Sequence, residues 1–331
     1  MTVFIPVYNG EPFIRSTIHS VLAQTYADYE LLIVDDGSTD GTADILRSVA
    51  DPRIRLARNE VNRGRPYTRN RGVGLARGEY IAVLDADDLS EPTRLQRQVE
   101  FLDAHPEIAC VGSHAIYVNR DETRQLLCQP PTRPDDIRRH IYQANCFVHS
   151  SVTFRRAVLL NIGGYSADYP QSQDYELFLR LCGAYPLANL PEPLVRYRVH
   201  PGQVSFARLR AQRRLADQAR VAAYRAAAAA DHLLPGTHPP ETSTIARLLG
   251  KRGTCGRDYL DWSFTYRALG EPALADALVF RSLLYAPLSR AGWRELRTAL
   301  RRLLRVDPVR NRLRWYGTRI ARFLKGSVHE R

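Results

Sequence analysis

The stretch GEYIAVLDADD, from Gly78 to Asp88, decides the fold class of this chain. Its apolar run, Tyr80–Leu84, is typical of a buried parallel strand, because both faces of such a strand are covered. The run ends abruptly in Asp85, Asp87 and Asp88. Three carboxylates at the end of a buried strand are too costly to bury without a partner, so the sequence predicts a cation close to them.

Asp85 and Asp87 are two residues apart, and a turn at this point lets both carboxylates converge on one ion. Hard oxygen ligands suit Mg²⁺ or Mn²⁺, which proteins usually bind beside a substrate phosphate. The alternative is an acidic turn that caps the next helix, with Asp88 or Ser90 as the N-cap.

The first hundred residues alternate between strand and helix signals. We expect strands at residues 3–7, 30–34, 53–57 and 80–84, and helices at residues 11–23, 42–49, 66–76 and 93–102. This order predicts an α/β fold with a mostly parallel central sheet and helices on both faces. Ligands bind such sheets outside the carboxyl ends of the strands, where the polar clusters of this sequence fall. These clusters are Tyr8-Asn9, Asp35-Asp36-Gly37-Ser38 and Asp85-Ala86-Asp87-Asp88.

The rest of the chain is less regular. Strands are expected at residues 108–118 and 194–199, and helices at residues 155–160 and 174–182. From about residue 206 the pattern is helical and rich in Ala, Arg and Leu. We therefore expect an α/β domain over residues 1–205 and a basic α-helical region over residues 206–331.

The net charge of +12 is unevenly distributed, with −3 on residues 1–205 and +15 on residues 206–331. Basic blocks of this kind attract nucleic acid, anionic lipid or acidic partners. Five scattered cysteines without a CxxC motif indicate a reducing compartment, and argue against a disulfide framework or a zinc site. Neither a signal peptide nor a run of 18 apolar residues is visible in the sequence.

Four further positions are candidates for chemistry or binding. Asp36 follows the second strand and can accept hydrogen bonds from a base or ribose, although a plain turn explains the residues after it. The segment 62–72 brings four arginines to the same sheet edge, and we expect one of them to bind ligand, with a solvated helix face as the alternative. Asp174 lies in the first turn of a helix, where it either serves as a general base or only stabilises the helix. His200 is either a ligand or a surface residue.

The motifs IPVYNGE, VDDGSTDGT, ARGEYIAVLDADD, QDYELFLR and YRVHPGQVS occur in this order over residues 1–205. Their set and spacing resemble the family-2 inverting glycosyltransferases of the Rossmann-like GT-A fold, in their bacterial, non-processive form. The resemblance implies a nucleotide-diphosphate sugar as donor, with a UDP-sugar favoured, and Mg²⁺ or Mn²⁺ as cofactor. It further implies a glycan or lipid-linked acceptor and a role in cell envelope polysaccharide or glycolipid synthesis.

The resemblance also assigns roles to individual residues. Pro6, Tyr8 and Asp36 would contact the nucleotide base and ribose, and Arg69 the base or the phosphates. Asp85 and Asp87 match the DxD motif, with Asp87 as the direct metal ligand. Asp174 matches the catalytic base, and His200 a position that approaches the metal or the diphosphate.

The sequence departs from the family pattern at three points. Gln173 precedes the proposed base, where many members have Glu. The QxxRW motif of processive synthases is missing, so we expect transfer of a single sugar. The few residues that usually precede the first strand are also missing, so we expect a truncated start.

Two other functions compete with the glycosyltransferase hypothesis. A sugar-phosphate nucleotidyltransferase should have a GxGTR-like loop with Lys near the amino terminus, and this chain has IPVYNGE there. A non-catalytic nucleotide-sugar-binding or scaffold protein should have a damaged DxD motif or base, and both are intact. The loops at 112–150 and 163–173, which would select sugar, nucleotide and acceptor, contain no readable motif.

The last predicted feature is an amphipathic segment at residues 293–325. Leucines recur there at helical spacing, aromatic residues follow Pro308, and arginines fill the remaining positions. A basic amphipathic pair of helices predicts binding to an anionic membrane surface. The alternative is that the apolar stripe packs on the catalytic domain or a partner. We expect a cytoplasmic protein, peripheral at the inner face of the cell membrane, and no nucleic-acid partner.

Overall fold

The computed structural model describes residues 1–200, 202–203, 208–238 and 262–270, and the single positions 272, 275, 276, 278, 279 and 282. The chain divides into two compact units. One is Met1–Arg247 with Ala268–Gly270, and the other is Leu248–Arg267 with Glu271–Arg331. The predicted amphipathic segment at 293–325 lies outside the described residues.

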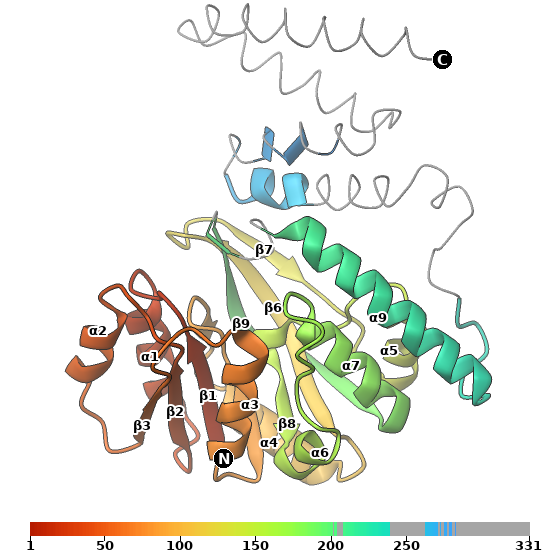
Figure 1. The fold of residues 1–331 in the computed structure, drawn as a ribbon, viewed down its shortest axis with the longest axis horizontal. Coiled ribbons are helices and arrows are strands. Elements are labelled where there is room, and N and C mark those ends of the chain that lie inside the picture. The colour runs from red at the N-terminus through yellow and green to blue at the C-terminus, as the bar shows by residue number, and fades with distance from the viewer. Residues whose placement is uncertain are drawn as a thin grey trace, which may run out of the picture. The chain divides into compact units, whose positions relative to one another are not determined.

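A nine-stranded sheet forms the centre of the first unit (Figure 1). Its strands are β1 (Thr2–Val7), β2 (Glu30–Asp35), β3 (Ile54–Arg58), β4 (Tyr80–Val83), β5 (Leu89–Ser90), β6 (Cys110–Asn119), β7 (Gln125–Cys128), β8 (Thr153–Arg155) and β9 (Leu187–Val199). They lie in the order β3-β2-β1-β4-β8-β6-β9-β5, with β7 beside β6. The strands β3, β2, β1 and β4 are parallel, as are β6 and β9, whereas β8, β5 and β7 pair antiparallel.

Helices cover both faces of this sheet, which confirms the predicted α/β fold. They are α1 (Ile14–Leu22), α2 (Thr42–Ser48), α3 (Arg65–Leu75), α4 (Arg94–Ala104), α5 (Pro134–His140), the 3₁₀ helix η1 (His149–Ser151), α6 (Arg156–Asn161), α7 (Gln173–Ala184) and α9 (Leu209–Ala229). Helices α1, α2 and α4 contribute to one apolar cluster, and α3, α5, α6, α7 and α9 to another. Figure 1 shows α3 in front of β1, and α7 beside α9.

Alternation along β1 explains how the two faces are separated. Val3, Ile5 and Val7 belong to the cluster with α1 and α2, whereas Phe4 belongs to the cluster with α3. Gly72 of α3 lies so close to the Phe4 ring that a Cβ atom at this position would overlap it. The close approach of α3 to β1 holds Arg69, one helical turn before Gly72, beside the strand ends.

The second half of the sheet differs in part from the sequence-based expectation. The strand predicted at 194–199 is the last part of β9, which begins at Leu187. Pro191 and Pro193 interrupt the strand pattern there, and the pairing of β9 with β6 shifts register around His114. Strands β7 and β8 and helix α5 were not predicted, because they are short and lack an apolar period of their own.

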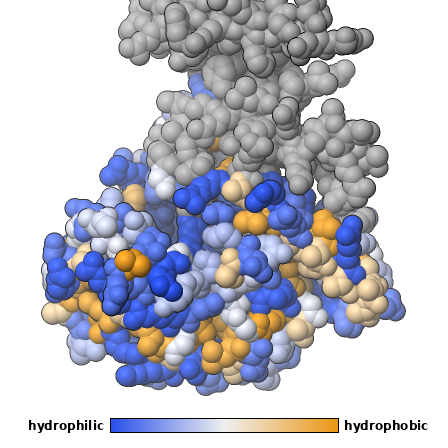
Figure 2. All heavy atoms as spheres, viewed as in Figure 1, coloured by the Kyte–Doolittle hydropathy of each residue, from blue (hydrophilic) through white to orange (hydrophobic). Residues whose placement is uncertain are grey.

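Helix α9 follows the predicted domain boundary and packs against α7, and its Ala219 and Ala227 belong to the same apolar cluster as that helix. The first compact unit therefore extends past residue 205, while the division of function at that point remains a prediction. The visible face of the described residues is mostly hydrophilic, with apolar side chains in small groups (Figure 2). None of the described helices combines the length and apolarity of a membrane-spanning segment.

Candidate active site

The polar turns predicted at the sheet edge are brought together by the register of β1, β2 and β4. Val7 is paired with Asp35, and Phe4 with Val83, so these strands end side by side. Pro6 is half-buried in β1, and the Tyr8 ring after it is exposed. Asn9 has a positive φ of 53° and its Oδ1 accepts a hydrogen bond from the Thr39 N–H at 2.9 Å. The turns after β1 and β2 therefore form one continuous wall.

The two aspartates at the end of β2 both accept hydrogen bonds from backbone N–H groups. Asp36 is buried and accepts hydrogen bonds from the N–H groups of Arg63 (2.8 Å) and Gly64 (2.9 Å) and from the amide of Asn59 (2.7 Å). Asp35 accepts a hydrogen bond from the Ser38 N–H at 2.9 Å. Asp36, predicted to contact the nucleotide, therefore also holds the loop that leads into α3.

Arg69 is buried and bonded to Asp85, the first aspartate of the DxD motif. Its Nη2 donates to Oδ1 of Asp85 at 2.7 Å, and its guanidinium lies 5.5 Å from the centre of the Tyr165 ring. The Gln173 amide satisfies both its atoms when its oxygen accepts from Arg69 and its nitrogen donates to the Pro170 carbonyl at 2.8 Å. Arg69 therefore links the turn after β4 to the start of α7.

His149 and Tyr165 complete this buried cluster. Nε2 of His149 is 3.0 Å from the Tyr165 hydroxyl, and its Nδ1 is 3.9 Å from Oδ2 of Asp85. Burial raises the pKa of Asp85, but the charge of Arg69, with the nearby His149, outweighs it and holds this pKa well below the ordinary range. Burial, reinforced by the charge of Arg69, lowers the pKa of His149. Asp85 therefore stays ionised beside a neutral imidazole.

Asp87 and His200, the two predicted metal ligands, are brought together although 113 residues separate them. Oδ2 of Asp87 is 3.1 Å from Nε2 of His200, and the imidazole packs against the Phe13 ring at 4.7 Å between centroids. Both side chains are partly accessible to solvent. A carboxylate and an imidazole at this separation can act together on one cation.

The N-cap alternative for Asp88 and Ser90 is wrong, because helix α4 begins only at Arg94, with Thr93 as its N-cap. Asp88 is instead buried and bonded to the Ser150 hydroxyl and, at 2.8 Å, to the Arg198 N–H. Burial, with the charges of Asp87 and Asp85, raises the pKa of Asp88 well above its ordinary value.

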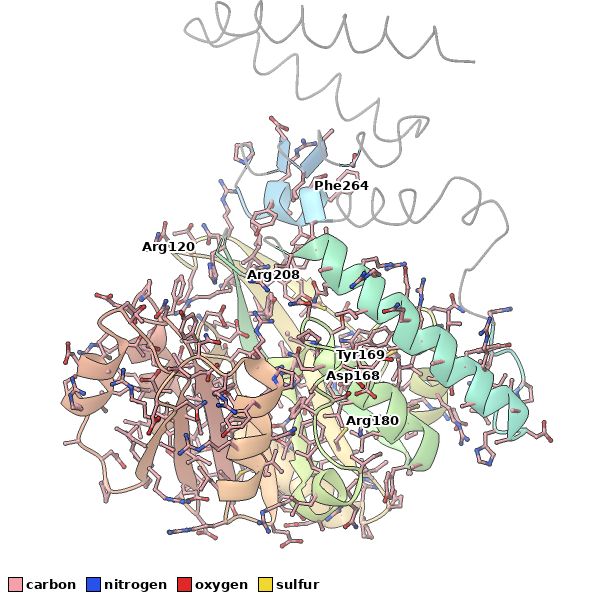
Figure 3. The ribbon with its side chains drawn as sticks, viewed as in Figure 1. Arg120, Asp168, Tyr169, Arg180, Arg208 and Phe264 are labelled. Atoms are coloured by element: carbon pink, nitrogen blue, oxygen red, sulfur yellow. The ribbon has the colours of Figure 1, made fainter. Side chains whose placement is uncertain are left out.

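Arg198 fixes the position of the DxD turn from the opposite side. Its guanidinium donates to the Asp87 carbonyl at 3.1 Å, to the Ser16 hydroxyl at 3.2 Å and to Glu122 at 2.9 Å. It therefore joins α1, the turn after β4 and the β6–β7 hairpin at one point. Arg120, in the turn of this hairpin (Figure 3), has its guanidinium 5.8 Å from the centre of the Phe13 ring.

Asp174 occupies the second position of α7, after the N-cap residue Ser172. Within the described part of the chain its carboxylate has no hydrogen bond or ion pair, so it is not a capping side chain. Its charge acts on Arg65, Arg69, His149 and Tyr165, which places it at the same cluster as Asp85. A half-buried carboxylate without a partner is available to accept a proton.

The loop before α7 is tied to that helix by Arg180 (Figure 3). The Arg180 guanidinium donates to the carbonyls of Ile162 and Gly164, both at 2.6 Å, and pairs with Glu176. Because this loop carries Tyr165, the cluster around Asp85 is held from both ends of α7.

Sequence reasoning missed several residues of this site. His149 and Tyr165 lie outside the quoted motifs and far along the chain from Asp85 and Arg69, so no local pattern marks them. Arg198 lies within the YRVHPGQVS motif, and its type and position were the one available signal.

A family model described as glycosyl transferase family 2 matches residues 2–163. UDP-Glc:alpha-D-GlcNAc-diphosphoundecaprenol beta-1,3-glucosyltransferase WfaP of Escherichia coli is 31% identical over 209 residues, which cover 62% of this chain and 79% of that protein. An uncharacterized glycosyltransferase of Haemophilus influenzae is 31% identical over 216 residues, which cover 62% of this chain and 67% of that protein.

Solved structures share the fold of this chain. TarS of S. aureus in complex with UDP-GlcNAc has a TM-score of 0.55 and 18% identity, covering 90% of this chain and 89% of that chain. The mannosyltransferase PcManGT of Pyrobaculum calidifontis, in complex with GDP-Man and Mn²⁺, has a TM-score of 0.51 and 22% identity, covering 94% of this chain and 81% of that chain. At these identities the likeness shows the fold. Because both curated relatives exceed 30% identity over two thirds or more of their length, the chain belongs to glycosyl transferase family 2 and is a glycosyltransferase.

Proposed function

We propose that this glycosyltransferase transfers one sugar, with inversion, from a nucleotide-diphosphate sugar to an acceptor hydroxyl, and that it needs a divalent cation. The observation that carries the proposal is the partnerless carboxylate of Asp174 at the cluster of Asp85 and Arg69. An ionised carboxylate in this position suits a general base. Family membership leaves the nucleotidyltransferase and scaffold hypotheses without support.

Each step assigns a task to a residue of this chain. Asp174 accepts the proton of the acceptor hydroxyl while the acceptor oxygen forms its bond to the anomeric carbon, opposite the departing diphosphate. Pro6, Tyr8 and Asp36 bind the nucleoside at the wall formed by the turns after β1 and β2. Arg69 and Asp85 would lie between the nucleoside and the general base Asp174. The family resemblance makes Arg69 a contact of the nucleotide base or of the phosphates.

Asp87 and His200 are the residues that would hold Mg²⁺ or Mn²⁺. Among the described residues, no group of three or more His, Cys, Asp or Glu side chains is placed to hold a metal. The pair nevertheless fits, because such ions are bound by one or two protein ligands together with substrate phosphates and water. The cation, when bound, would stabilise the negative charge of the leaving diphosphate.

The name of the Escherichia coli relative includes a UDP-sugar and a diphosphoundecaprenol-linked acceptor. We extend this chemistry to the present chain as a proposal, with a UDP-sugar as donor, a glycan or lipid-linked acceptor, and a role in cell envelope polysaccharide or glycolipid synthesis. Residues 1–205 would form the catalytic domain.

The test is a panel of UDP-, GDP- and dTDP-sugars, assayed for hydrolysis with Mg²⁺, with Mn²⁺ and with EDTA. We expect one nucleotide class to be hydrolysed only with a divalent ion. Equal hydrolysis in EDTA would contradict the metal requirement, and no hydrolysis or binding of any donor would contradict the donor class.

A cytoplasmic location at the inner face of the membrane is also proposed, and it rests on the basic sequence of residues 206–331. The full chain should sediment with anionic vesicles at low salt and remain in solution with neutral ones. If it stays in the supernatant with both, the membrane proposal fails.

A further inference from the structure

Arg65 is the first residue of α3 and lies one helical turn before Arg69. Residues four apart share a face of a helix, so Arg65 lies on the same face of α3 as Arg69, which bonds to Asp85. Helix α3 starts at the carboxyl edge of the sheet and runs back along it. Along the helix axis Arg65 is therefore closer to that edge than Arg69 by about 6 Å, the rise of four residues.

The surroundings of Arg65 are acidic, but it is paired with none of the acids. The charges of Asp85, Asp174 and Asp87 all act on it, and the described residues provide it with no hydrogen bond or ion pair. Its side chain is accessible to solvent, yet enough protein surrounds it that burial, followed by the charge of Arg69, lowers its pKa. An arginine remains protonated under such a shift, so Arg65 presents a full positive charge to the site.

The other arginines of the segment 62–72 are already engaged. The Arg63 guanidinium lies over the Tyr67 ring, 4.7 Å from its centre. Arg71 donates to the Arg58 carbonyl at 2.7 Å, and Arg69 donates to Asp85. Within the described structure, Arg65 is the arginine of this segment whose guanidinium remains free to bind a further ligand group, beside the contact that the resemblance assigns to Arg69.

We propose that Arg65 binds the diphosphate of the sugar donor and neutralises its charge as the sugar leaves. The proposal rests on the proposed function, and it assigns to Arg65 a contact that neither the motifs nor the comparisons assign. In the transfer, the bond between the anomeric carbon and the diphosphate oxygen breaks, and its electron pair goes to that oxygen. The acceptor oxygen forms the new bond and its proton goes to Asp174. The planar guanidinium fork suits two phosphate oxygens.

The experiment compares the full-length wild type with Arg65→Ala and Arg65→Lys by calorimetry in Mg²⁺. The probes are UDP, GDP and dTDP, and the nucleoside of whichever binds most tightly. We expect Arg65→Ala to lower the affinity for the nucleoside diphosphate about 10- to 100-fold, as for loss of a charge-assisted hydrogen bond. The affinity for the nucleoside should not change. Arg65→Lys keeps the charge but not the planar fork, so its diphosphate affinity should lie between those of the wild type and Arg65→Ala.

Arg63→Ala is the matched control, because it removes the same charge two residues earlier from a side chain engaged with Tyr67. It should change the diphosphate affinity less than threefold. Thermal unfolding checks that each variant is folded. If Arg65→Ala is not folded, the diphosphate affinity of Arg65→Lys is compared with that of the wild type instead.

Three results would overturn the inference. Arg65→Ala could bind the diphosphate as tightly as the wild type does. Arg63→Ala could lose as much diphosphate affinity as Arg65→Ala, or Arg65→Ala could lose nucleoside and diphosphate affinity equally. If Arg65→Ala kept the diphosphate affinity but slowed transfer, Arg65 would bind an anionic group of the acceptor and not of the donor, and the inference would fail. If wild type bound none of the three diphosphates, the proposed function itself would fail, which separates the two failures.

Discussion

The turn after β2 and the turn after β4 both place aspartates at the carboxyl edge of one sheet, yet their carboxylates are bonded differently. Asp36 accepts hydrogen bonds from the Asn59 side chain and from two backbone N–H groups, and these backbone groups cannot leave it without unfolding the loop before α3. Asp85 and Asp87 are bonded to the side chains of Arg69 and His200, which can rotate. The first turn builds the wall of the site, and the second can exchange its partners for a ligand.

Asp174 extends this comparison, because its carboxylate has no partner in the described structure at all. Groups tuned for chemistry are often left without the bonds that would stabilise the folded state most. The three aspartates therefore form a series, from Asp36 with backbone partners, through Asp87 with a side-chain partner, to Asp174 with none. Substitution by Asn in each tests whether activity and stability follow this series.

Asp174→Asn should have the largest effect. The amide cannot accept the acceptor proton, so turnover should fall about 10²- to 10⁴-fold while donor affinity is retained. A transfer or donor-hydrolysis assay measures the first quantity, and calorimetry with the nucleotide sugar measures the second.

Asp28→Asn is the control for this experiment, since Asp28 is exposed in the loop just before β2, at the amino edge of the sheet, and its side chain has no hydrogen bond or ion pair in the described structure. Its activity should match wild type. An equal loss of donor binding in Asp174→Asn, or a failure to fold, would show that Asp174 supports the helix rather than the chemistry.

Asp87→Asn should have the next largest effect. Loss of one charged ligand should weaken Mn²⁺ binding by at least about 10- to 100-fold, the range found for residues that only support metal ligands, and transfer should be abolished at low metal concentration. Titration with Mn²⁺ measures the affinity, and urea unfolding should show an unchanged free energy. Wild-type activity of this variant at low metal concentration would show that the DxD assignment is wrong.

Asp36→Asn should have the smallest effect on chemistry and a distinct effect on stability. The introduced NH₂ group faces the N–H donors of Arg63 or Gly64, so the free energy of unfolding should fall by about 1–2 kcal/mol. Urea unfolding without nucleotide measures this change, with the exposed Asp44→Asn as a control expected to stay within about 0.5 kcal/mol. If Asp36→Asn were as stable as the control Asp44→Asn, the proposed difference between the turns after β2 and β4 would not hold.

The first hundred residues could be predicted closely because parallel strands buried on both faces appear as apolar runs. The run predicted at 80–84 is β4 at Tyr80–Val83, and the helix predicted at 66–76 is α3 at Arg65–Leu75. The second half could not be predicted as well. Strand β8 has three residues and owes its place to pairing with β4 and β6, which are distant in the sequence.

The same physical division applies to the site. The sequence by itself determined the α/β fold, the turns at one sheet edge and the identity of the acidic residues there, because strand burial and alternation are local properties. Only the tertiary structure decided which partner each charge has. Arg69 became the partner of Asp85, Arg65 was left without one, and His200 reached Asp87, since hydrogen bonds and ion pairs depend on atoms within about 4 Å and not on spacing along the chain.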